Sequence, residues 1–189
     1  MRSPYVILVA ALSLLLLVNP AVPGVWMSPS PPWWLGDVTI LVGLLSVWLF
    51  VRALLVSQLQ AMTVSGEFGK DPITRNLLAA VLARTGVCAL WATLMVFLLM
   101  GFKPIPAGAK VTDLVGTYAT VGAIIGLAGC AVKSCAVQRE SFRRMKAAGS
   151  DGMRNRIRAH VVCAVCDLFV LGSVITVAGR LAKGFGWIS

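Results

Sequence analysis

Long uninterrupted apolar runs, rather than an alternation of apolar and polar positions, dominate this chain. The first run, "YVILVAALSLLLLV" (5–18), carries no charged residue and ends at the two prolines of "NPAVPG". Four further apolar stretches follow, each long enough for a membrane-spanning helix of about 20 residues. Because a helix satisfies its own backbone hydrogen bonds in lipid, the pattern predicts an all-α integral membrane protein with about five transmembrane helices.

Glycines, prolines and helix-capping residues divide the chain into an N-terminal helix and two long helical hairpins. A cleaved first segment is the open alternative to a retained, signal-anchor-like first helix, and it would leave four spans. The predicted boundaries are 1–19 for the N-terminal transmembrane helix, 20–36 for a Pro/Trp-rich extracytoplasmic loop, 37–101 for the first hairpin, 102–110 for a short extracytoplasmic loop, 111–183 for the second hairpin and 184–189 for the tail.

Both hairpins are expected to extend beyond the bilayer and into the cytoplasm. Asp71 followed by Pro72 is a capping residue before the first helical turn, and the helix that it starts can run to Gly101. The next helix is expected to be continuous from Thr112 to Lys146, because no proline interrupts it. Both helices exceed the roughly 20 residues that cross the hydrocarbon core.

The composition is that of a membrane protein, and the distribution of its basic residues predicts its orientation in the membrane. The chain has 189 residues, of which 58% are hydrophobic and 13% charged, whereas soluble domains carry about 25% charged residues. Of its 17 lysines and arginines, thirteen fall on the side of the hairpin tips. The other four are Lys103, Lys110, Arg180 and Lys183. The positive-inside tendency then predicts a cytoplasmic N-terminus and an extracytoplasmic C-terminus, in a bacterial cytoplasmic membrane or one derived from it.

The tip of the second hairpin, "RESFRRMKAAGSDGMRNRIRAH" (139–160, the basic tip), holds most of this charge. Its seven basic residues are Arg139, Arg143, Arg144, Lys146, Arg154, Arg156 and Arg158. Ordinary topology explains them, and each gains about 1 kcal/mol near anionic lipid headgroups. A protein partner is the alternative. We expect no nucleic-acid partner, because only Phe142 is interleaved with the basic residues to stack on bases.

Asp167 is the most costly residue in the sequence. It falls about 4–5 Å from the bilayer centre at 1.5 Å per residue, where a carboxylate normally faces the protein interior with a partner. Arg52 and Arg84 lie about 9–11 Å from the centre in neighbouring spans, and each could reach Asp167 or snorkel to the interface. We expect an intramembrane ion pair. A proton or ion pathway and an inter-subunit contact are the alternatives.

Small residues and tryptophans mark two further kinds of contact. Gly122, Gly126 and Cys130 form a stripe at i, i+4 and i+8, with Gly129 beside it, and such stripes let helices approach closely. The stripe leaves open whether the partner helix belongs to the same chain or another copy. The candidate interface anchors are Trp26, Trp33 and Trp34.

No chemistry-bearing constellation predicts an enzyme. His160, Cys163 and Cys166 are weak metal candidates, because the first and last lie about 9 Å apart along one helix. Haem held by two histidines of one chain is excluded, since the chain has a single His. The sequence contains no nucleotide-binding or hydrolase motif. We therefore expect no cofactor, no metal and no catalysis.

Packing surfaces without catalytic residues favour a structural role. We expect a non-enzymatic multi-pass subunit of a larger membrane assembly of the secretion, conjugation or virus-envelope type. Its partners would be membrane lipids and other membrane subunits or further copies of itself. The alternative is a homo-oligomeric, holin-like pore or a small transporter that uses Asp167 with Arg52 or Arg84.

Overall fold

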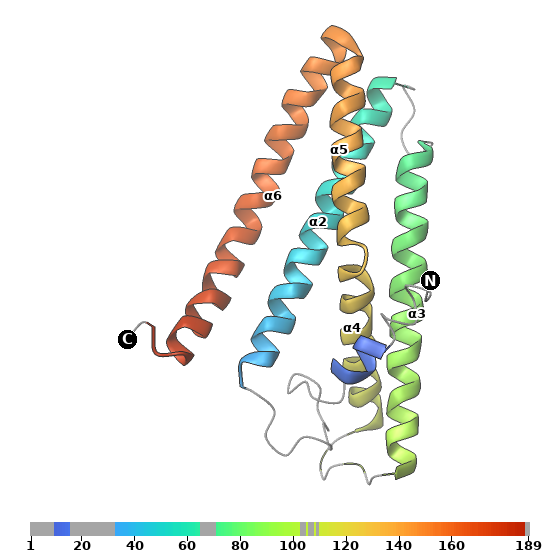
Figure 1. The fold of residues 1–189 in the computed structure, drawn as a ribbon, viewed down its shortest axis with the longest axis vertical. Helices are drawn as coiled ribbons and strands as arrows, with labels where there is room; N and C mark the ends of the chain where they lie inside the picture. Colours follow the sequence, from blue (N-terminus) through green and yellow to red (C-terminus); the bar gives the residue numbers. More distant parts are fainter. Residues whose placement is uncertain are drawn as a thin grey trace.

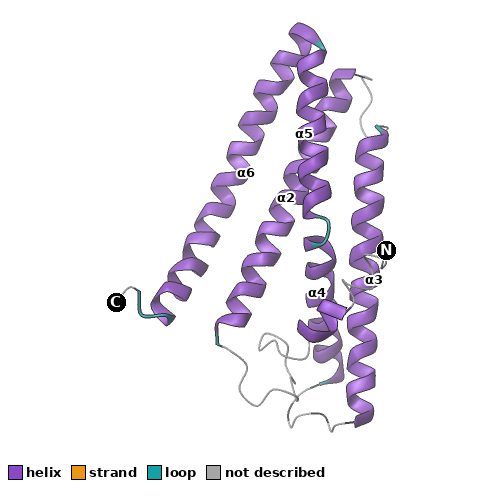
Figure 2. Cartoon of the chain, in the orientation of Figure 1, coloured by secondary structure: helices purple, strands orange, loops and turns teal. Residues whose placement is uncertain are grey.

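The computed structural model describes residues 10–15, 33–64, 71–102, 105, 108 and 110–187 (Figure 1). These parts of the chain are helical and contain no strand (Figure 2). The helices are α2 (Trp34–Val64), α3 (Pro72–Phe102), α4 (Val111–Ala128), α5 (Ala131–Ala147) and α6 (Gly149–Gly184).

Four helices, α2, α3, α4 and α6, are long and apolar enough to cross a membrane. This confirms an all-α protein whose composition and helix lengths are those of a multi-pass membrane protein. Of the first apolar segment, the structure describes only the helical residues 10–15, so the rest of that predicted span lies outside the described residues. Leu12 of this turn is fully buried against α3 and α4, in a cluster that includes Ala92 and Tyr118.

Helix α3 begins where the sequence predicts it. The carboxylate of Asp71 accepts hydrogen bonds from the backbone N–H groups of Ile73 (3.1 Å) and Thr74 (3.3 Å), which are free in the first turn of any helix. Helix α2 starts at Trp34, three residues before the expected Asp37. Trp26 and most of the expected loop 20–36 lie outside the described residues.

The expected continuous helix from Thr112 to Lys146 is wrong, because a turn at Gly129 and Cys130 separates α4 from α5. The N–H of Cys130 donates to the carbonyl of Leu127 (2.9 Å), a bond that closes over three residues instead of four. The regular pattern resumes when Ser134 donates to the carbonyl of Cys130 (2.9 Å). Helices α4 and α5 therefore follow each other along nearly one line in Figure 1 but are two helices.

The predicted hairpins do not pack as separate units. Helix α3 packs most extensively against α4, whereas α2 packs against α6 and α5 and has few contacts with α3. The two helices of each predicted hairpin thus find most of their contacts in the other hairpin. The core beside α3 and α4 consists of Leu12, Cys88, Ala92, Val96, Leu99, Leu114, Tyr118 and Val121.

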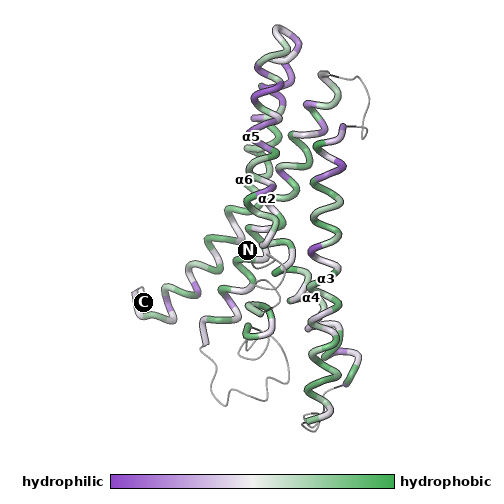
Figure 3. Tube along the Cα trace, turned by 45° about the vertical axis from the view of Figure 1, so that its right-hand side comes forward, coloured by the Kyte–Doolittle hydropathy of each residue, from purple (hydrophilic) through white to green (hydrophobic). Residues whose placement is uncertain are grey.

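The turn between α5 and α6 forms one end of the molecule. Gly149, the first residue of α6, has φ +71°, a left-handed conformation that glycine adopts without steric cost, and it lets the chain turn after α5 ends at Ala147. Hydrophilic residues gather at this tip, while hydrophobic residues predominate in the lower parts of the helices (Figure 3). The basic tip therefore stands at the end opposite the last turn of α3 (Figure 1).

Candidate functional site

The candidate site lies where the middle of α2 faces the middle of α6. Nη1 of Arg52 is 3.0 Å from Oδ1 and 3.2 Å from Oδ2 of Asp167. The indole Nε1 of Trp48 also donates to Oδ1 of Asp167, at 2.9 Å. Trp48 precedes Arg52 by four residues, so both side chains project from one face of α2. The Arg52 guanidinium lies 5.3 Å from the Trp48 ring centroid, within range of a cation–π contact.

The ion pair is covered on one side only. The side chain of Arg52 is 24% exposed and that of Asp167 is 43% exposed. Beside the carboxylate, Leu168 and Phe169 are also exposed on α6. Nε of Arg52 is buried and has no hydrogen-bond partner among the described residues. The two charges neutralise each other, but the carboxylate still has an open face.

Three polar contacts hold α6 to α2 along most of its length. Arg180 pairs with Asp37 at one end of the two helices. At the other end, Nδ2 of Asn155 donates to Oγ1 of Thr63 at 2.9 Å. With the central pair between them, the contacts run in opposite directions along the two helices, so they fix an antiparallel register. The sequence analysis did not predict either end contact. The signal was the spacing, since each pair of residues lies about equally far along α2 and α6 from the central ion pair.

Arg84 does not reach Asp167. Its Nη1 donates to the carbonyl oxygen of Gly129 and lies 3.9 Å from Sγ of Cys130. The reason is that α3 packs against α4 rather than α6, which turns Arg84 toward the break between α4 and α5. There the guanidinium donates a hydrogen bond to the Gly129 carbonyl oxygen. In a continuous helix a backbone N–H four residues later would donate to that oxygen.

The small-residue stripe of α4 packs against α3 of the same chain. A Cβ added at Gly122 would stand 2.5 Å from the carbonyl oxygen of Cys88, and one added at Gly126 would stand 2.6 Å from that of Arg84. Real Cβ atoms do not approach so closely, so both glycines are required by this contact. Cys130, at the end of the stripe, is fully buried.

The His and Cys candidates do not converge on one point. The His160 ring stacks on Phe142, with ring centroids 4.8 Å apart. Cys163 is buried and receives a weak contact from the Gln138 amide at 3.8 Å, while Cys166 lines an apolar groove beside Trp48. Within the described residues, no group of three His, Cys, Asp or Glu side chains could hold a metal ion.

Most of the basic side chains of the tip are exposed. Glu140 pairs with Arg144 (3.0 Å) and with Arg143 (2.9 Å). The hydrogen bond from Arg144 holds the pKa of Glu140 below its ordinary value, and the charges of Arg143 and Arg144 lower it further. The exposed basic residues of the tip are Arg139, Arg143, Arg144, Lys146, Arg154 and Arg158, while Arg156 is half-buried.

Aromatic residues gather at the end opposite the basic tip. Trp33 is half-exposed and packs against Phe185, with ring centroids 4.9 Å apart, and Phe185 in turn stacks on Trp187. Trp34, the first residue of α2, is half-buried. Such a cluster at one end of a helical bundle is typical of a membrane–water interface.

The fold and the site define a class: an all-helical protein with four helices long and apolar enough to cross a membrane, as in a multi-pass membrane protein, and an ion pair between two of them. Comparison with protein-family models, with curated proteins and with solved structures gives no match. The function is therefore inferred from the geometry of the chain itself.

Proposed function

We propose that this chain is a non-enzymatic subunit of a larger membrane assembly, of the secretion, conjugation or virus-envelope type, and that α6 carries the contact surface. The half-exposed carboxylate of Asp167 is the observation that supports this role. A charged group near the bilayer centre costs about 2.5–3.5 kcal/mol on insertion scales and normally faces protein or water. Among the four candidate spans, α6 is also the least buried. A neighbouring polypeptide on this side of α6 would cover Asp167 and Leu168.

Photo-crosslinking from α6 tests this role. We would place benzoylphenylalanine at Leu168, and at Leu98 of α3, which is also exposed, as the control. The expected result is a crosslink to a second polypeptide from Leu168 and none from Leu98. Lipid adducts alone at both positions would contradict the proposal. The mass of the particle extracted into nanodiscs then distinguishes copies of this chain from other subunits.

The finer topology belongs to the same proposal. We place five spans in a bacterial cytoplasmic membrane or one derived from it, with the N-terminus and hairpin tips in the cytoplasm. The burial of Leu12 against α3 and α4 supports a first span beside them, and the charge of the basic tip supports its cytoplasmic placement. Reporter fusions after Gly149 and after Ser189 should report opposite sides of the membrane.

The basic tip is proposed to contact anionic lipid headgroups or an acidic surface of a neighbouring subunit. Its exposed arginines supply the positive charge. The negative potential of an anionic membrane falls off within about 10 Å of its surface, so the arginines must lie close to the headgroups to be attracted. Charge reversal at Arg154 and Arg158 should reduce flotation with vesicles that contain phosphatidylglycerol. If the variant floats as well as the parent protein, these two arginines do not contact the lipid.

A pore or small transporter is the second candidate, because the ion pair of Arg52 and Asp167 lies beside two hollows of the structure. Asp167→Asn separates the two functions in proteoliposomes. A pathway predicts lost conductance in a variant that assembles normally, whereas a subunit contact predicts impaired assembly and no conductance in either protein. Ser173→Ala, also on α6 and exposed, is the matched control.

A further inference from the structure

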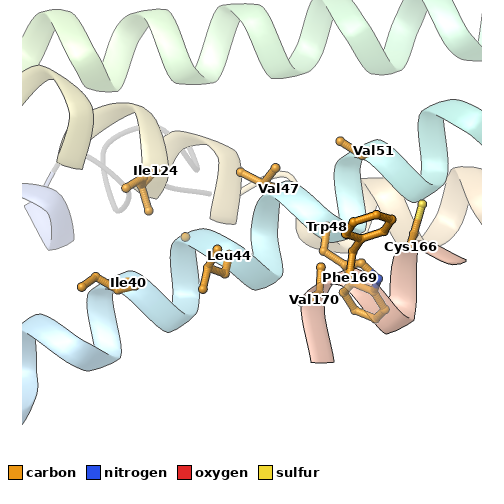
Figure 4. Close-up of a pocket in the computed structure, with 10 residues that line it drawn as sticks. Ile40, Leu44, Val47, Trp48, Val51, Ile124, Cys166, Phe169 and Val170 are labelled. Carbon is orange, nitrogen blue, oxygen red and sulfur yellow. The ribbon is translucent and has the colours of Figure 1, made fainter. Parts of the chain in front are cut away.

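Two neighbouring hollows lie along α2, and together they are called the groove. The inner hollow, of about 490 Å³, lies between α2, α4 and α6 and reaches Trp48 (Figure 4). The outer hollow, of about 540 Å³, lies between the first turns of α2 and most of the length of α4, and Asp113 is part of its lining. Both are lined by Ile40 and Ile124, so they adjoin at these two side chains. Each has the size of an ordinary small-molecule site, about 300–1,000 Å³.

The groove changes in chemistry along its length. The inner hollow is lined by hydrocarbon and aromatic side chains together with Cys166, and Figure 4 shows these side chains contributed by three helices. The outer mouth instead has the carboxylate of Asp113 and several threonine hydroxyls. These threonines are Thr39, Thr112, Thr117 and Thr120. Asp113 is the one charged residue among the described residues that line either hollow, and the exposed Lys110 precedes it by three positions. Such a gradient fits a molecule with an apolar tail and a head that carries a cation.

We propose that this groove binds one phosphatidylethanolamine molecule, with an acyl chain in the inner hollow and its ammonium group at Asp113. A primary ammonium donates charge-assisted hydrogen bonds to a carboxylate, and the phosphate of the same headgroup then lies on the side of Lys110. Phosphatidylglycerol would bring its phosphate to Asp113 without a cation. Phosphatidylcholine has a quaternary ammonium with no hydrogen to donate. The site lies at the end opposite the basic tip, so it is separate from the anionic-lipid contacts proposed there.

Two glycines leave the groove open. A Cβ at Gly43 would stand 3.2 Å from Cγ2 of Ile124, so a larger residue there would press on the wall that both hollows share. A Cβ at Gly116, in the mouth, would meet nothing within 4 Å. The side chain of Gly116→Phe therefore begins in open space at the mouth. Gly172→Phe, which also enters open space but on α6 away from the groove, is the matched control.

Native mass spectrometry of the whole chain tests the site. The purified protein is exposed in micelles to equal amounts of phosphatidylethanolamine, phosphatidylglycerol and phosphatidylcholine with identical acyl chains. We expect one phosphatidylethanolamine per chain, preferred about fivefold or more, which corresponds to one charge-assisted hydrogen bond. Gly116→Phe should lose this lipid, while Gly172→Phe should keep it. Asp113→Asn should still hold a lipid but no longer prefer the ethanolamine headgroup.

Three results would overturn the proposal. Equal retention of all three lipids would show only non-specific surface lipid, and retention of phosphatidylethanolamine by Gly116→Phe would place the lipid elsewhere. If Asp113→Asn still prefers phosphatidylethanolamine, Asp113 does not bind the headgroup. Circular dichroism checks that each variant is folded. If Gly116→Phe is not, Thr120→Leu narrows the same mouth from an exposed position, with the same two outcomes.

Discussion

Arg52 and Asp167 stand 115 positions apart in the sequence, yet one nitrogen of the guanidinium contacts both oxygens of the carboxylate. The indole of Trp48 donates to the same carboxylate from one turn earlier on α2. The contact therefore joins α2 and α6 through three side chains at mid-length. Because helices in lipid gain little from apolar contact alone, such polar contacts have a large share in fixing which faces meet.

Removal of one partner of this pair should destabilise the protein more than removal of both. Asp167→Asn leaves Arg52 without its counter-ion, and we expect a loss of about 1–3 kcal/mol, less than for a fully buried pair because the carboxylate is partly open. The double variant with Arg52→Gln should cost less than Asp167→Asn alone, because it leaves no unpaired charge. Unfolding by sodium dodecyl sulfate in mixed micelles measures each value. Simple additivity of the two changes would show that the side chains are not coupled.

The contact between α3 and α4 should be intolerant of a single methyl group. Gly122→Ala places a carbon 2.5 Å from the carbonyl oxygen of Cys88 and 2.7 Å from Cβ of Ala92, so the helices must separate. We expect a loss of about 1–3 kcal/mol, the usual range for overpacking. Gly116→Ala on the same helix meets open space and should be neutral or stabilising by up to about 1 kcal/mol. Thermal unfolding compares the pair, and equal behaviour would place the close contact elsewhere.

The lengths of the apolar helices and the start of α3 were predictable from the sequence because they depend on local signals. Pro72 and the Asp71 cap set the start of α3, and the length of each apolar run sets the number of helices that could cross a membrane. The position of Asp167 near the middle of α6 was equally readable. These features need only the rise per residue and the chemistry of nearby positions.

Rotation and pairing of the helices were not predictable in the same way. Arg52 and Arg84 were equivalent by depth, but only the rotation of α2 directs Arg52 to Asp167, and α3 turns Arg84 to Gly129. The break between α4 and α5 was also missed, because no proline near Gly129 marks the end of a helix in the sequence. It is a tertiary effect, since an arginine from another helix supplies the donor that the turn needs.

Arg84 should therefore matter for the break rather than for the ion pair. Arg84→Met removes the donor to the Gly129 carbonyl and should cost about 1–2 kcal/mol, as expected for a lost hydrogen bond from a charged group. Hydrogen exchange should quicken at Ser134 and its neighbours in the first turn of α5. Arg75→Met, at an exposed position on the same helix, should leave that exchange unchanged. Protection that stays the same in both variants would show that the turn holds without Arg84.

Glu140 should titrate below its ordinary range of about 4.5, because Arg144 hydrogen-bonds the ionised carboxylate. A lowered pKa in the folded state means that the ion pairs stabilise the basic tip above the ordinary pKa. That stabilisation is lost as the pH falls through the lowered value. Carbon-13 NMR of the Glu140 carboxyl measures the midpoint directly. Arg144→Gln should raise it more than Arg143→Gln does, since the hydrogen bond from Arg144 is the larger cause. A larger effect from Arg143 would reverse that assignment, and a midpoint at the ordinary value in the parent protein would show that neither arginine holds the carboxylate in solution.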